Sequence, residues 1–150
     1  MTTCNVCGSK VQPLNGKPRS YDQHKRFFAM CKAAFDHWPE QHAEQFSDAT
    51  DCRKYLTMKA GWRDIASKIN LTGIREDKAI LLATAVLSGL PKNCYARPVL
   101  HNGQLIVWVP KSIAYDKMPH LEMCALSDAV AEVIEAETGM KIEDMMQVAA

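Results

Sequence analysis

Residues 17–29 have the sequence KPRSYDQHKRFFA, which combines a helix-start signal with a cluster of positive charge. Ser20 is a favoured N-cap residue and Gln23 follows three positions later, so each side chain can satisfy one backbone N–H at the start of a helix. We therefore expect a helix from Ser20 to about Trp38, ended by Pro39. Apolar residues recur along it at intervals of three and four, which predicts one buried stripe: Phe27, Cys31, Ala34, Phe35 and Trp38.

Positive side chains gather around the start of this helix. A polyanion could contact several of them on one rigid element, and Tyr21 could stack on an unpaired base. This pattern predicts binding of single-stranded or structured DNA. The candidate nucleic-acid-binding residues are Lys10, Lys17, Arg19, Tyr21, Lys25, Arg26 and Lys32.

The charge of the chain is unevenly distributed, although the net charge of all 150 residues is only +1. Residues 1–34 hold six basic side chains and one acidic, a net charge of +5, whereas residues 115–150 hold two basic and eight acidic, a net charge of −6. The acidic end supports a second hypothesis, in which a C-terminal helix binds a basic cleft on a host protein. Charge runs are also typical of solvated surfaces that bind nothing specific.

Three further helices are expected. Ser47 or Asp48 can cap one that runs to Ala60, where Gly61 stops it. Residues 75–88 are almost wholly apolar after their charged start, which predicts the central helix of the fold. Pro119 fits the first position of a long helix to about Glu137, with Gly139 as its stop, and a short Met-rich helix could follow.

Between these helices the periodicity changes to that of strands. Residues 94–100 and 104–109 are rich in β-formers and flank Asn102-Gly103, a strong signal for a two-residue hairpin turn. Pro98 in the first run predicts an edge strand. An isolated hairpin is marginally stable, so we expect it to pack on helices or to pair with the edge of another copy.

The expected fold is therefore α+β and mainly helical, with four to five helices and one β-hairpin. Residues 1–18 are rich in turn formers and form a Cys-x-x-Cys arm or knuckle, and residues 19–150 form a single domain. No apolar run approaches the ~20 residues of a membrane span, and the N-terminus lacks a secretory pattern. We therefore expect a cytoplasmic protein whose cysteines are thiols or metal ligands.

The sequence Cys4-Asn5-Val6-Cys7-Gly8 has the form of a zinc knuckle, in which a tight turn directs two thiolates at one metal. Zinc requires four ligands, so Cys4 and Cys7 are half a site. An inert exposed pair and a redox pair are the alternatives. The missing ligands would come from another subunit or from the set His24, Cys31, His37 and His42. Cys31, Cys52 and Cys124 fall in helical patterns, where we expect buried, apolar cysteines.

No catalytic signature accompanies the five histidines, which are scattered singly along the chain. A compact His-Asn-His motif, a carboxylate cluster and a Gly-x-Ser-x-Gly motif are all missing from the sequence. We therefore expect a noncatalytic protein. The three tryptophans are expected in the core because each closes an apolar stripe or lies in a strand: Trp38, Trp62 and Trp108.

Three segments carry a resemblance to a family of small phage and prophage proteins known only as a domain of unknown function. They are Arg19-Ser20 with Gln23 and Phe27-Phe28, then YLTMKAG at residues 55–61, and VPKSIAYDKM at residues 109–118. The first segment is also similar to the start of the lambda-type Orf (NinB) recombination mediators, which act on single-stranded DNA. The Cys4/Cys7 knuckle and the acidic tail lie outside these segments.

This resemblance implies a phage-encoded protein that acts in the host cytoplasm in replication or recombination. Together with the basic helix, it predicts a noncatalytic nucleic-acid-binding accessory protein, a homodimer that offers two copies of the helix to one strand. The alternative is a counter-defence or host-takeover factor that binds a host protein through its acidic C-terminal helix.

Overall fold

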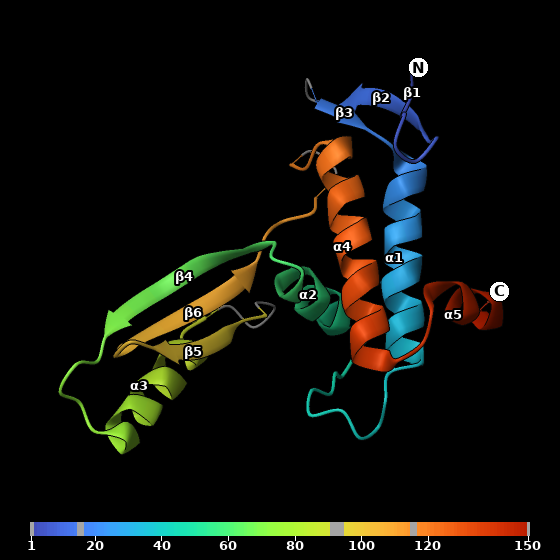
Figure 1. Ribbon diagram of the computed structural model, residues 1–150. Helices are drawn as coiled ribbons and strands as arrows, with labels where there is room; N and C mark the ends of the chain where they lie inside the picture. The colour runs from blue at the N-terminus through green and yellow to red at the C-terminus, as the bar shows by residue number, and fades with distance from the viewer. Residues whose placement is uncertain (1, 15–16, 91–94, 115–116, 150) are drawn as a thin grey trace. The chain divides into compact units, whose positions relative to one another are not determined.

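A computed structural model describes residues 2–14, 17–90, 95–114 and 117–149 (Figure 1). Within these residues the protein is α+β, as expected, with five helices and two antiparallel three-stranded sheets. The chain divides into two compact units, which we call unit 1 (Met1–Gly61 with Ser112–Ala150) and unit 2 (Trp62–Lys111). The expectation of a single domain over residues 19–150 stays a prediction.

Four helices of unit 1 pack around a common core: α1 (Tyr21–Asp36), α2 (Ala49–Lys59), α4 (His120–Thr138) and α5 (Ile142–Ala149). In Figure 1, α1 and α4 run side by side. The stripe predicted on α1 supplies Phe27, Cys31 and Ala34 to this core. The other helices contribute fully buried apolar side chains, among them Leu56, Leu126, Val130, Ile134 and Met145.

The predicted starts of α1 and α2 and the predicted stop of α4 are confirmed at their caps, whereas α1 ends at Asp36, before the predicted end at Trp38. The Ser20 hydroxyl accepts a hydrogen bond from the Gln23 backbone N–H at 3.2 Å, and the Asp48 carboxylate accepts one from the Asp51 N–H at 2.8 Å. Gly139 ends α4 in the left-handed conformation, with φ of 72°. Pro119 is the N-cap of α4, one position earlier than predicted.

The N-terminal residues form a small sheet that was not predicted. Its strands are β1 (Thr2–Thr3), β2 (Lys10–Leu14) and β3 (Lys17–Arg19), in the order β1-β2-β3. Pro13 lies opposite Pro18 in this ribbon. Proline cannot donate to a strand ladder and is therefore uncommon in strands, so the sequence of these two runs does not indicate strands. The Cys-x-x-Cys loop therefore connects two strands, β1 and β2.

Unit 2 contains β4 (Arg63–Asn70), α3 (Glu76–Ser88), β5 (Arg97–His101) and β6 (Gln104–Pro110), with strand order β4-β6-β5. The hairpin turn is confirmed, since φ is 50° at Asn102 and 72° at Gly103. Pro98 lies in the edge strand β5, as predicted. Cys94, the expected start of that run, lies outside the described residues.

The prediction of one hairpin without a third strand is wrong, because β4 pairs with β6 along most of its length. The register of this pair shifts between Ile65 and Ser67. This irregularity breaks the two-residue alternation by which strands are recognised in a sequence. The hairpin thus completes its sheet within unit 2, without another copy of the chain.

The expectation that residues 75–88 form the central helix is also wrong. Within α3 only Ala79 is buried, while Ile80 and Leu81 are 57% and 69% exposed. The helix packs one side against the sheet, in a core of Leu71, Ala79, Leu105 and Val107. None of the described helices is long and apolar enough to span a membrane.

Arg19 is fully buried in unit 1, at the junction of β3 and α1. Its guanidinium donates hydrogen bonds to the carbonyl of Met118 at 2.9 Å and to that of Ile113 at 3.4 Å. It also lies 2.6 Å from Nδ1 of His24, which must accept because arginine has no acceptor. Arg19 therefore joins the N-terminal sheet to the segment that leads into α4.

We expect Arg19→Ala to lower the free energy of unfolding by about 3 kcal/mol, since it leaves buried carbonyl groups without their charged donor. Urea denaturation followed by circular dichroism measures the change. Lys32→Ala is the control, because its exposed ion pair with Asp36 should contribute less than about 1 kcal/mol. Equal effects of the two substitutions would contradict the structural role of Arg19.

Candidate metal centre

The Cys-x-x-Cys loop is held in a tight turn by its own backbone. The N–H of Gly8 donates to the carbonyl of Cys4 at 2.9 Å, and the N–H of Cys4 donates to the carbonyl of Ser9 at 2.8 Å. Gly8 has φ of 73°, a conformation that favours glycine. The Val6 N–H donates to Sγ of Cys4 at 3.4 Å, so the loop also orients one sulfur.

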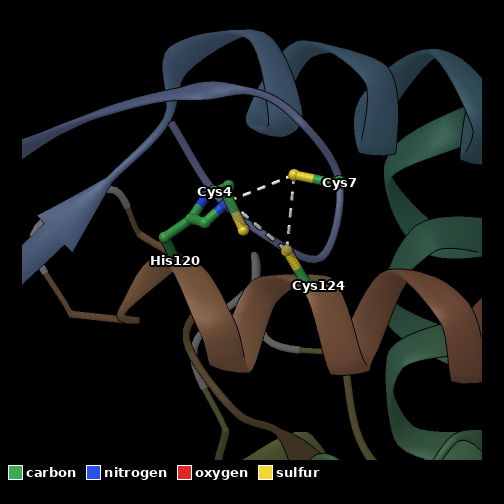
Figure 2. A group of neighbouring side chains, drawn as sticks. All are labelled: Cys4, Cys7, His120 and Cys124. Carbon is green, nitrogen blue, oxygen red and sulfur yellow. Dashed lines mark hydrogen bonds between the residues drawn. The ribbon is translucent and has the colours of Figure 1, made fainter. Parts of the chain in front are cut away.

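Two side chains from the first turns of α4 complete the cluster. His120 and Cys124 are four residues apart and so lie on the same face of the helix. Figure 2 shows both pointing toward Cys4 and Cys7. Nε2 of His120 lies 3.2 Å from Sγ of Cys7 and 3.4 Å from Sγ of Cys124, and the two sulfurs are 3.7 Å apart.

The geometry and burial of this cluster suit a tetrahedral ion. One nitrogen or sulfur atom from each of the four residues lies within 4.8 Å of all the others. Zn–S bonds of about 2.3 Å give a tetrahedral edge of roughly 3.8 Å between sulfurs, close to the observed separation of Cys7 and Cys124. Cys4, His120 and Cys124 are buried, and Cys7 is half-buried.

The protonation of the thiols is set by their neighbours. Burial acts to raise the pKa of Cys7, but hydrogen bonds from the side chain and backbone of Ser9, with weaker ones from Cys124 and His120, lower that pKa to about 6. Burial and the adjacent Cys7 raise the pKa of Cys124 to about 12. Cys7 is therefore the thiolate of the pair, and Cys124 is the thiol that donates to it.

The polar surroundings of the cluster differ between its two sides. Arg26 donates a hydrogen bond to the Ser9 hydroxyl, which in turn stabilises the thiolate of Cys7. Nδ1 of His120 is buried and has no hydrogen-bond partner among the described residues. Nε2 of His120 faces the sulfurs and can serve as a metal ligand.

The ligands expected to complete the half-site do not join it. His24 accepts from Arg19, His37 contacts the carbonyl of Ala33, His42 pairs with Glu137, and Cys31 is buried in α1, where burial raises its pKa. Cys124 is buried as predicted, but it also contacts Cys7 and His120, which was not predicted. The sequence signal was His120-x-x-x-Cys124 at a helix start, but nothing local connects it to Cys4 and Cys7.

The predicted nucleic-acid-binding residues comprise exposed side chains, two arginines that bind other parts of unit 1, and one residue whose side chain is not described. Lys25 and Lys32 are exposed on α1, and Nζ of Lys25 lies 4.4 Å from the ring centroid of Tyr21. Lys10 is exposed on β2. Arg26 supports Ser9 and Gln23, and burial removes Arg19 from the surface. The side chain of Lys17 lies outside the described residues.

Four of the exposed residues of α1 form a line that we call the α1 stripe: Tyr21, Lys25, Phe28 and Lys32. Their spacing of four, three and four residues places them on one face of the helix. Arg53 of α2 adds a cation, since its guanidinium lies 4.7 Å over the ring of Phe28. Phe28 was not predicted as a surface residue, because the sequence gives it the same character as the buried Phe27.

Comparison with known proteins yields no match to a family model, to a curated protein or to a solved structure. The resemblance to a phage protein family therefore stays a prediction.

Proposed function

We propose that Cys4, Cys7, His120 and Cys124 bind one Zn²⁺ ion, and that the ion is structural. Three thiols and one imidazole are donors that zinc prefers, and four protein ligands leave no position for a reacting water. The ion would join the loop between β1 and β2 to the first turns of α4, more than 110 residues further along the chain. Its binding would therefore contribute directly to the stability of unit 1.

We further propose that the protein is a noncatalytic, phage-encoded nucleic-acid-binding accessory protein that acts in replication or recombination in the host cytoplasm. The observation that supports it is the α1 stripe, where aromatic and cationic side chains alternate along an exposed face. Single-stranded DNA is bound by this combination, because bases stack on rings while cations contact phosphates.

The positive charges of the α1 stripe come from lysine and arginine side chains and not from the neighbouring His24. Burial lowers the pKa of His24, as do the positive charges of Arg19 and Arg53, so that its ring is neutral at pH 7. Lys25, Lys32 and Arg53 are then the cations available to phosphates. A homodimer would present two such stripes to one strand and so increase a weak affinity.

A second candidate function is binding of a basic host protein by the acidic C-terminal helices. Asp128, Glu132 and Glu135 are exposed at a spacing of four and three residues, which places them on one face of α4. Glu137 does not belong to this face, because it lies near His42, Tyr55 and Lys59 inside unit 1.

For the metal, we expect purified protein to contain one zinc per chain, measured by inductively coupled plasma mass spectrometry. Cys124→Ser should lose the ion and lower the Tm by on the order of 10 °C. Cys31→Ala, which removes a buried thiol outside the cluster, should retain the zinc. Wild-type protein without zinc, and with a melting curve that chelation leaves unchanged, would refute the site.

For DNA, we expect Lys25→Glu combined with Lys32→Glu to weaken binding of a labelled single-stranded oligonucleotide by at least about tenfold in fluorescence anisotropy. Three phosphate contacts give a slope of log affinity against log salt of about −2, and the variant should flatten it. Lys78→Glu with Lys141→Glu, an equal change in charge at exposed positions, is the matched control.

Charge reversal on α4 separates the two candidate functions. Glu132→Lys with Glu135→Lys should leave DNA binding intact if the α1 stripe is the binding surface. An absence of DNA binding at low salt would refute the nucleic-acid proposal. If the Lys78→Glu, Lys141→Glu control bound DNA as weakly as the Lys25→Glu, Lys32→Glu variant, only the total charge of the protein would matter.

A further inference from the structure

The sheet of unit 2 has one face that α3 does not cover. Leu105 and Val107 of β6 are buried in the core beneath α3. Since successive side chains of a strand point to opposite faces, their neighbours in β6 point away from that core. The strand register then places residues of all three strands together on what we call the open face: Arg63, Ile65, Lys68, Asn70, Arg97, Val99, His101, Gln104, Ile106 and Trp108.

Trp108 lies in the middle of the open face, on the central strand. Its direct neighbours in register are Ile65 on β4 and Arg97 on β5. The guanidinium of Arg63, two residues before Ile65, lies 4.5 Å over the indole ring. Trp108 is half-buried, so the expectation that it belongs to the core is wrong. It is an aromatic platform in contact with a cation.

The area around Trp108 is apolar and accessible. Ile65 is 49% exposed and Val99 is 44% exposed, values that are unusual for large apolar residues near the centre of a sheet. Ile106 lies on β6 between Lys68 and Val99, because it pairs with both. Together these side chains extend the apolar surface beside Trp108.

The charged residues of this face are all positive. Arg63 and Lys68 are on β4 and Arg97 is on β5, so cations flank Trp108 on both sides of the central strand. Within the three strands, each of which the structure describes, the single carboxylate is Asp64, which alternates with Arg63 and Ile65 and so lies on the opposite face. The open face is therefore complementary to a polyanion.

We propose that the open face of unit 2 binds single-stranded DNA, with a base stacked on Trp108 and phosphates contacted by Arg63, Lys68 and Arg97. Bases are accessible to a flat sheet only when they are unpaired, which excludes an intact duplex as the ligand. The ligand is of the same class as for the α1 stripe, but the residues and the unit are different.

The experiment measures binding of a fluorescein-labelled oligo(dT) of about 20 nucleotides to the full-length protein by anisotropy, with oligo(rU) and duplex DNA in parallel. Arg63→Glu with Lys68→Glu should weaken oligo(dT) binding at least about tenfold. Trp108→Ala should weaken it by a factor of about ten, and Trp108→Phe, which retains a ring, by less than about threefold. Lys78→Glu with Lys141→Glu, an equal change in charge at exposed positions outside the open face, is the matched control and should have no effect.

A second readout keeps the test valid if Trp108→Ala fails to fold. Oligo(dT) should quench part of the tryptophan fluorescence of the wild-type protein, and that part should be lost in Trp108→Phe, because Trp38 and Trp62 lie outside the open face. Absence of such quenching, together with unchanged affinity in the Arg63→Glu, Lys68→Glu variant, would overturn the proposal. Tighter binding of oligo(rU) or of duplex would also overturn it.

Variants in each surface distinguish the proposal for the α1 stripe from the proposal for the open face. If reversal at Lys25 and Lys32 abolishes binding while reversal on the open face does nothing, the inference about the sheet is wrong and the α1 stripe stands. The opposite result would support the open face and refute the α1 stripe. Absence of oligo(dT) binding by the wild-type protein at low salt would refute both.

Discussion

The N-terminal sheet of unit 1 is too small to hold itself in place, so its position depends on contacts with the residues around the start of α4. Two strands of two and three residues flank β2, and strands of this length bury little surface. Two sets of contacts compensate. The Cys3His cluster holds the loop between β1 and β2 against α4, and the buried guanidinium of Arg19 holds the end of β3 against the carbonyls of Ile113 and Met118.

These contacts also decide what the basic residues of the N-terminal region can do. Arg19 holds the sheet in place and is buried, so its charge does not reach the surface, whereas Arg26 holds the Cys7 loop through Ser9 and is itself exposed. Lys25 and Lys32 point outward from α1 and keep their charges at the surface. The net charge of +5 over residues 1–34 thus overstates the positive surface, because a sum of charges does not distinguish a buried arginine from an exposed lysine.

Features set by neighbouring residues could be predicted from the sequence, and those set by distant residues could not. Ser20, Asp48 and Gly139 act within one turn of their helices, and Asn102-Gly103 fixes its own turn, so these predictions are confirmed. The Cys-x-x-Cys half of the site is equally local. Its partners His120 and Cys124 reach it only through packing of α1 and α4, and Arg19 is buried by segments far along the chain. The strand β4 was missed because its irregular register breaks the pattern.

The two cationic surfaces differ in what a phosphate has to displace. Lys32 forms an ion pair with Asp36 at 3.1 Å, so a phosphate at that end of the α1 stripe competes with a carboxylate. Arg63 on the open face contacts the ring of Trp108, and a guanidinium over a ring keeps its N–H groups available at the ring's edge. A phosphate can therefore bind Arg63 without breaking an ion pair, while a base gains the neighbouring apolar surface. This difference favours the open face as the tighter of the two proposed surfaces for single-stranded DNA.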